Sequence, residues 1–128
     1  MIPSGKATEM DRGPLKCPLT VNAIMVEADA HAHEAGFRDS THTATFGEHI
    51  ALCHSELSEA LEAFRKDGMV SMRFTDSGKP EGVGEELADV IIRVCDMAML
   101  FNIPLEDCIR HKMLYNRTRP KHHGGKSI

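Results

Sequence analysis

Tryptophan is absent from the sequence and tyrosine occurs once, so aromatic side chains can supply little of a hydrophobic core. Eight methionines compensate in part, because this flexible side chain fills irregular interior space. A chain of 128 residues, with 41% hydrophobic and 27% charged side chains, is long enough for one compact domain and too short for two sizeable cores. The composition therefore argues against wholesale disorder and predicts one globular unit.

Long hydrophobic runs are also missing from the chain. Acidic, basic or histidine side chains interrupt every apolar stretch before it reaches the roughly 18 residues that a membrane-spanning helix requires. The first 18 residues are interrupted by Lys6, Glu9, Asp11 and Arg12 and contain no apolar segment of the kind found in secretory signals. We therefore expect a cytoplasmic protein that does not enter the membrane.

The cysteines do not form a motif typical of a zinc site or a redox site. Cys17, Cys53, Cys95 and Cys108 form no C-x-x-C pair and have no histidine at zinc-finger spacing. Three of them fall at apolar or semi-apolar positions of expected helices, where cysteine acts as a small hydrophobic residue. This pattern favours free thiols in a reducing compartment.

Charge is distributed unevenly along the chain. Residues 111–128 carry five basic side chains and no acidic one, so a tail of +5 accompanies a body of −9 and the net charge is −4. Broad nucleic-acid binding requires a basic face, which the body lacks, and we expect no nucleic-acid partner. An acidic body beside a basic tail suits a protein that handles metal ions and phosphates together.

The spacing of apolar residues predicts about four helices and no long strand. A T-x-x-E capping box opens the second helix, and glycines follow the first and second. The expected helices run from Thr20 to Gly36, from Phe46 to about Gly68, from Leu87 to about Asn102, and from about Pro104 to Arg117.

The remaining segments predict irregular structure. Residues 69–84 are rich in glycine and proline and favour a loop, with at most a brief extended piece at 69–74. We expect an all-α fold, an antiparallel helical bundle. Its domain would span residues 19–119, between an irregular arm at 1–18 and a flexible basic tail at 120–128.

Two acidic pairs of equal spacing are the most informative local pattern. Glu56 and Glu59 lie in the second expected helix, and Glu86 and Asp89 lie in the third. Residues three apart share one helix face with Cβ atoms about 5–6 Å apart, so antiparallel packing can bring four carboxylates together. Such a cluster needs cations to stay ionised. Oxygen ligands favour Mg²⁺ or Mn²⁺, and a Mg²⁺ site in turn implies a phosphate-bearing ligand.

These acids have two other possible interpretations. A single E-x-x-E or E-x-x-D pair is usually a solvated acidic face of an amphipathic helix, and this interpretation stays open. A di-iron bundle needs Glu-x-x-His motifs on its core helices, and neither pair is followed by histidine at that spacing.

Basic residues downstream are candidates for phosphate contacts. Lys112 and Asn116 lie one helical turn apart, and Arg119 and Lys126 follow them toward the C-terminus. Lysine and arginine beside a metal site neutralise a polyphosphate, and two glycines before Lys126 allow the tail to fold over it. The alternative is a solvated basic C-terminus.

Other side chains are candidates for contacts outside the acidic pairs. Phe46, at the start of the second helix, is a candidate for stacking on a base, with a core or capping role as the alternative. Asn22 and His31 of the first helix are candidates for contacting a base edge. Arg93 and Asp96 follow Asp89 on the third helix, where they either support the metal ligands or form an intrahelical ion pair, and we favour the ion pair.

Three strings of the sequence together resemble the MazG-like all-α nucleoside triphosphate pyrophosphohydrolases. They are HSELSEALEAFR at 54–65, EELADVIIRVCDMA at 85–98 and KMLYNRTRPKHHGGK at 112–126. The pattern of that family is E-x-x-E, a variable gap, E-x-x-D, and then Lys and Asn four residues apart on the last helix. The gap here is 26 residues, and the resemblance covers about Thr20 to Lys126.

The resemblance implies hydrolysis of a (deoxy)nucleoside triphosphate to the monophosphate and pyrophosphate, with two or three Mg²⁺ ions, or Mn²⁺ in their place, clamping the phosphates. Glu56 or Glu59 would orient or deprotonate the attacking water. The residues assigned by the resemblance are Glu56, Glu59, Glu86 and Asp89 for metal ligation, and Lys112, Asn116 and Arg119 for phosphate contacts.

The substrate and the assembly are less defined. Among dGTP, dCTP and dUTP we place dGTP first, because phage-type relatives (MazZ) remove that nucleotide. The alternatives are an enzyme similar to phosphoribosyl-ATP pyrophosphatase and a non-catalytic helical interaction module. Four modest helices with a polar interior face leave little dry core, so we predict a homodimer or homotetramer, as the resemblance also implies.

Overall fold

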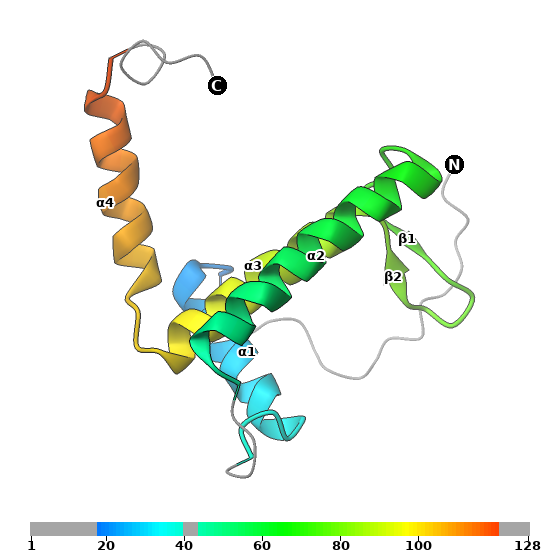
Figure 1. The fold of residues 1–128 in the computed structure, drawn as a ribbon, viewed down its shortest axis with the longest axis horizontal. Coiled ribbons are helices and arrows are strands. Elements are labelled where there is room, and N and C mark those ends of the chain that lie inside the picture. Colours follow the sequence, from blue (N-terminus) through cyan, green and yellow to red (C-terminus); the bar gives the residue numbers. More distant parts are fainter. Residues whose placement is uncertain (1–17, 40–43, 121–128) are drawn as a thin grey trace.

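The computed structural model describes residues 18–39 and 44–120 of the chain. Its described part is mostly helical, which confirms an all-α fold in this coarse sense. The helices lie where the apolar spacing predicts them, and a strand pair is added between the second and third (Figure 1). The elements are α1 (Val21–Glu34), α2 (Phe46–Asp67), β1 (Arg73–Phe74), β2 (Pro80–Glu81), α3 (Val83–Leu100) and α4 (Leu105–Thr118).

Polar caps define where α1 and α2 begin. The Glu48 backbone N–H donates to Thr45 Oγ1 at 3.2 Å, and the Thr45 N–H donates to the Glu48 carboxylate at 2.6 Å. This is the capping box that the T-x-x-E motif predicts. Thr20 caps α1 in a simpler way, since its hydroxyl accepts the Ala23 N–H at 3.0 Å.

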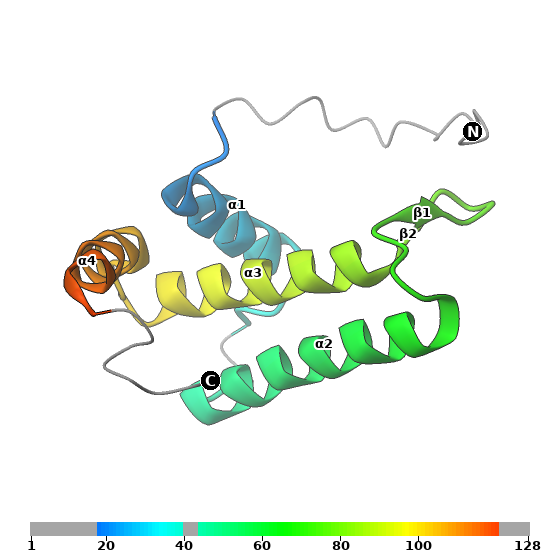
Figure 2. The ribbon, with the colours of Figure 1, turned by 90° about the horizontal axis from the view of Figure 1, so that it is seen from above.

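The α3 helix lies at the centre of the described body. It packs side by side with α2, and α1 packs against it as well (Figure 2). The β1–β2 hairpin reverses the chain between α2 and α3, so these two helices run antiparallel. A small core forms between α1 and α3 around Met25, Cys95 and Ala98.

The α4 helix differs from the other three because it projects from the end of α3 and has no buried residue (Figure 1). Its first turn is anchored to α1. Leu105 packs against the small core, and Asn22 Nδ2 donates to Glu106 Oε2 at 2.7 Å. The described chain therefore departs from a closed four-helix bundle, since α1 and α2 each pack against α3, whereas α4 contacts the others only weakly.

Cys53, Cys95 and Cys108 are free thiols, and Cys95 is buried in the core. Cys17, nearly all of the predicted N-terminal arm and residues 121–128 of the predicted tail lie outside the described residues. Within the part of the chain that the structure describes, no helix is both long enough and apolar enough to cross a bilayer.

Gly84 allows the hairpin to approach the first turn of α3. Its backbone N–H donates to the Ser71 carbonyl at 2.7 Å, and a Cβ at this position would lie only 2.6 Å from that oxygen. Because the obstacle is backbone, we expect Gly84→Ala to lower the free energy of unfolding by about 2 kcal/mol. In a domain of this size, that loss lowers the melting temperature by roughly 8 °C. Thermal denaturation followed by circular dichroism measures this.

Gly47 provides the matched control for that substitution. It lies in the first turn of α2, and the nearest atom to a Cβ there is Thr45 Oγ1 at 4.0 Å. Gly47→Ala should leave the melting temperature unchanged or raise it, because alanine favours helix. Equal melting temperatures for Gly84→Ala and the wild type would contradict the close approach of hairpin and helix.

Candidate metal centre

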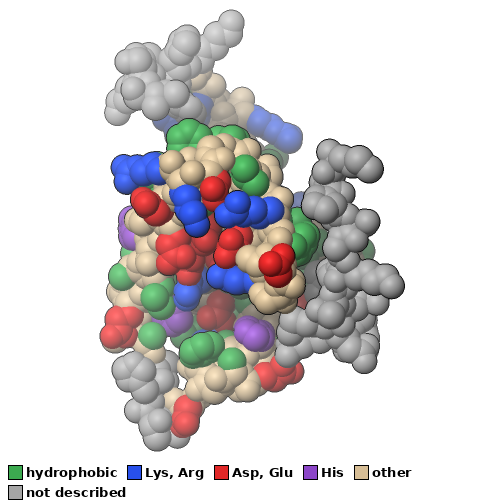
Figure 3. Space-filling view, turned by 90° about the vertical axis from the view of Figure 1, so that its right-hand side faces the viewer, with side chains coloured by type: hydrophobic (Ala, Val, Ile, Leu, Met, Phe, Trp, Pro, Cys, Tyr) green, Lys and Arg blue, Asp and Glu red, His purple; other side chains and the backbone are tan. Residues whose placement is uncertain are grey.

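Three carboxylates from two helices converge where α2 packs against α3. Glu56 comes from α2, and Glu86 and Asp89 come from the first two turns of α3. Each offers one oxygen, and these oxygens lie within 4.8 Å of one another. Glu56 is only 7% exposed, and the other two are half-buried. Figure 3 shows one face of the molecule on which acidic side chains gather, with lysine and arginine side chains beside them.

Glu59, the fourth predicted ligand, lies outside this group of three. It is exposed, one helical turn beyond Glu56 on α2. Its charge still acts on the cluster, because it is one of the groups that raise the pKa of Glu86. The structure therefore brings three of the four predicted ligands together and places Glu59 nearby, in solvent.

The pKa of Glu86 shows how much like charge the cluster holds. Burial, together with the charges of Glu85, Glu59, Asp89 and Glu56, raises this pKa to about 7. Burial also raises the pKa of Glu85, and the charge of Asp89 and a hydrogen bond with it raise that pKa further. The sequence analysis missed Glu85, although its position four residues before Asp89 signals the contact.

The raised pKa of Glu86 predicts a particular pH dependence of stability without metal. The folded chain binds an extra proton between the unfolded value of 4.5 and about 7, so the free energy of unfolding falls as pH rises through that window. We expect the melting temperature in chelator to be roughly 10 °C higher at about pH 5 than at about pH 8 because of this group. Thermal melts of wild type and Glu86→Gln at both pH values measure it.

The comparison between the two proteins isolates the contribution of Glu86. Glutamine cannot titrate, so the variant should lose most of the difference between the two pH values. Glu62→Gln, an exposed site on the same helix as Glu56, should keep the wild-type difference. An identical pH dependence in wild type and Glu86→Gln would show that Glu86 titrates normally.

A guanidinium group faces the most buried carboxylate of the cluster. Arg93 Nε donates to Glu56 Oε1 at 2.5 Å, which joins α3 to α2. The favoured intrahelical pair of Arg93 with Asp96 is therefore wrong. Asp96 instead accepts from Arg38, a buried side chain that also lies 3.5 Å from Asp29. The sequence analysis missed Arg38 because no local spacing links it to α3.

A cavity of about 860 Å³ lies between α1 and α3 and adjoins the carboxylate cluster. Asp89 and Arg93 line this cavity, so the cavity and the cluster share one wall. Most of the other lining side chains are aliphatic, and α1 contributes the polar groups of Glu27 and His31. A cavity of this size and composition is typical of small-molecule sites.

The residues predicted to contact phosphate lie on α4 or directly after it: Lys112, Asn116 and Arg119. The ammonium of Lys112 and the guanidinium of Arg119 lie 5.3 and 6.0 Å from the centroid of the Tyr115 ring. From Asp89 to the end of α3 the helix axis advances about 16 Å, and α4 begins only beyond that end. One described chain therefore does not bring these residues to its own carboxylates. Lys126 lies outside the described residues.

The residues predicted to contact a base are also separated from one another. Phe46 packs edge-on against Phe101, with ring centroids 5.3 Å apart, and this contact ties the start of α2 to the end of α3. Phe46 is about 15 Å along α2 from Glu56, too far to serve the cluster directly. Asn22 donates to Glu106, as described above, whereas His31 lines the cavity.

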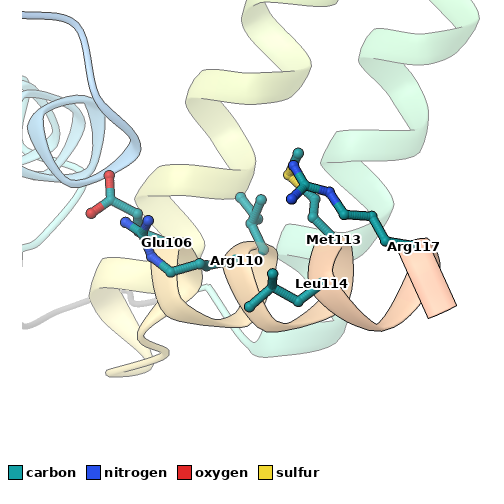
Figure 4. Close-up of a pocket in the computed structure, with 6 residues that line it drawn as sticks. Glu106, Arg110, Met113, Leu114 and Arg117 are labelled. Carbon is teal, nitrogen blue, oxygen red and sulfur yellow. The ribbon is translucent and has the colours of Figure 1, made fainter.

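A smaller hollow of about 340 Å³ runs along α4 and is lined by that helix alone. Its walls mix apolar side chains, Met113 and Leu114 among them, with the basic side chains of Arg110 and Arg117 (Figure 4). Met113 and Leu114 are 55% and 51% exposed, so this face of α4 has no apolar partner in the described chain.

No family model, curated protein or solved structure matches the chain in comparisons with known proteins. The likeness to MazG-like enzymes consequently rests on the three sequence strings. The geometry of the carboxylates, the arginine and the cavity is an independent source of evidence for function.

Proposed function

We propose that the chain is a divalent-metal-dependent hydrolase of a phosphate-bearing substrate. More specifically, we propose a cytoplasmic MazG-like enzyme that converts a (deoxy)nucleoside triphosphate to its monophosphate and pyrophosphate. The observation that carries the proposal is the convergence of Glu56, Glu86 and Asp89 from an E-x-x-E and an E-x-x-D helix. Three carboxylates around one point match the preference of Mg²⁺ and Mn²⁺ for oxygen ligands. We propose that two or three such ions bind at each site.

The roles of the acidic residues follow from their exposure. A bound Mg²⁺ would lower the pKa of a water molecule and neutralise charge on the phosphates. Glu59 is the exposed carboxylate beside the cluster, so it is free to accept a proton from that water. Glu56 is buried and engaged with Arg93, which favours a ligand role for it.

The cavity between α1 and α3 is the proposed site of the nucleoside. Asp89 and Arg93 place its phosphate end at the cluster, and the aliphatic walls suit a base and sugar. Glu27 offers two acceptor oxygens, and guanine presents adjacent N1–H and N2–H₂ donors on one edge. This complementarity supports dGTP as the preferred substrate among dGTP, dCTP and dUTP.

A substrate panel tests the proposed function. Pyrophosphate release is measured with the common ribo- and deoxyribonucleoside triphosphates and phosphoribosyl-ATP, in Mg²⁺, in Mn²⁺ and in chelator. We expect metal-dependent release that is fastest with dGTP and absent in chelator. Release from phosphoribosyl-ATP alone would select the phosphoribosyl-ATP pyrophosphatase alternative. No release from any substrate by folded protein would contradict the enzyme and leave the interaction module.

A homodimer or homotetramer is the proposed assembly. Among the described residues no leucine, isoleucine, valine or phenylalanine is buried, and the buried apolar side chains are those of alanine, methionine and cysteine. Two exposed apolar faces need a partner. They are Leu57, Leu61 and Phe64 on α2, and Ile109, Met113 and Leu114 on α4.

The position of α4 supports a site shared between two copies. After Glu106 and Asp107 in its first turn, the helix carries Arg110, Lys112 and Arg117 and no further acidic residue, and it projects from the end of α3 (Figure 1). Opposite charges favour packing of this basic part of α4 near the acidic face of a second copy. We propose that Lys112 and Asn116 reach the phosphates bound at the carboxylates of that second copy.

A further inference from the structure

Arg93 binds one oxygen of the most buried carboxylate in the cluster. Its Nε lies 2.5 Å from Glu56 Oε1, and the Glu56 side chain is only 10% exposed. A cation at hydrogen-bond distance from a buried carboxylate offsets part of the cost of burying that charge, as a bound metal would. Arg93 and a divalent ion would both be attracted to Glu56.

The Arg93 side chain also has room to leave this position. It is 41% exposed and starts from α3 one turn after Asp89. It lines the cavity between α1 and α3, where the proposed function places a triphosphate. The planar guanidinium binds two phosphate oxygens at once, which makes this second position favourable when a nucleotide is present.

We propose that Arg93 exchanges partners during binding. In the metal-free chain it neutralises Glu56, and when a divalent ion takes Glu56 the guanidinium turns to the phosphates in the cavity. The inference rests on the proposed function and adds a residue that none of the sequence motifs assigns. Arg93 thus pairs with the buried carboxylate before metal arrives and contacts substrate afterwards.

The first test is a Mn²⁺ titration of the full chain without nucleotide, followed by electron paramagnetic resonance. Removing a competing cation should increase metal affinity, so we expect Arg93→Gln to bind Mn²⁺ about tenfold more tightly than wild type. Arg73→Gln is the matched control, because Arg73 pairs with Asp67 and Glu81 at the hairpin and should leave Mn²⁺ affinity unchanged. A residue that only supports the fold would weaken metal binding when replaced.

The second test separates metal binding from substrate binding. At saturating Mn²⁺, Arg93→Gln should raise the KM for dGTP about tenfold, with a smaller effect on kcat. Arg93→Lys keeps the positive charge but loses the planar guanidinium that can bind two phosphate oxygens at once. Its Mn²⁺ affinity should therefore stay near the wild-type value, whereas the KM for dGTP should rise.

The outcomes distinguish this inference from the proposed function. Equal or weaker Mn²⁺ binding by Arg93→Gln, with wild type binding normally, overturns the partner exchange and leaves the metal site in place. An unchanged KM at saturating Mn²⁺ overturns the phosphate contact. No Mn²⁺ binding by the wild type overturns the proposed function itself.

Discussion

Asp89→Asn is expected to lower kcat/KM for pyrophosphate release about a thousandfold or more, with the helical fold retained. Asp89 belongs to the carboxylate cluster and also lines the cavity, so under the proposed function its charge would hold the metal beside the phosphates. The amide of asparagine is neutral and a poorer ligand for Mg²⁺. Steady-state kinetics at saturating Mg²⁺, with circular dichroism of the same samples, measures the effect.

Glu62→Gln is the control for this substitution. Glu62 lies on α2, its side chain is 72% exposed, and it pairs with Arg65 at 3.5 Å on the surface. We expect unchanged turnover and an unchanged rise of melting temperature in Mg²⁺ for this variant, whereas Asp89→Asn should lose that rise. Wild-type turnover by Asp89→Asn would mean that these acids are a solvated helix face.

Chains carrying Glu86→Gln and chains carrying Lys112→Ala should restore activity when they are co-expressed. Each variant alone is expected to be nearly inactive, because one lacks a cluster oxygen and the other a phosphate contact. If Lys112 serves the carboxylates of a second copy, about one quarter of the sites in the mixed assembly carry both intact residues. Turnover of the purified mixture should therefore reach about one quarter of the wild-type value.

Co-expression of Glu86→Gln with Asp89→Asn provides the negative control. Both substitutions damage the same cluster within one chain, so mixing cannot rebuild an intact site. We expect no recovery for that pair. If the mixture of Glu86→Gln and Lys112→Ala chains forms a mixed assembly but also recovers no activity, Lys112 does not belong to a shared site.

Local signals were sufficient to predict where the helices lie. The Thr45 and Glu48 capping box marks the start of α2, and the apolar stripe of residues 87–98 lies within α3. A brief extended piece was predicted at residues 69–74, where β1 lies. The β2 strand and its pairing with β1 went unpredicted because strands of two residues are too short to show an alternating pattern. Capping and periodicity act over one or two turns, which is why these elements could be read from neighbouring residues.

Contacts between helices were predicted only in part. Spacing placed Glu86 beside Asp89, but how α2 is rotated against α3 decides that Glu56 joins them and Glu59 stays exposed. The pair of Arg93 with Glu56 spans 37 residues, and no local pattern signals such a contact. The apolar face of α4 can be recognised in the sequence, and it indicates that this helix needs a packing partner. Only the structure shows that α1, α2 and α3 do not cover this face.

The most direct test of the proposed hydrolysis is ³¹P NMR of dGTP incubated with the wild-type chain and Mg²⁺. We predict that the triphosphate signals are replaced by those of pyrophosphate and a monophosphate, and that chelator prevents the change. Triphosphate signals that persist in both Mg²⁺ and Mn²⁺ with folded protein would contradict the account. Formation of orthophosphate and a diphosphate would contradict it as well.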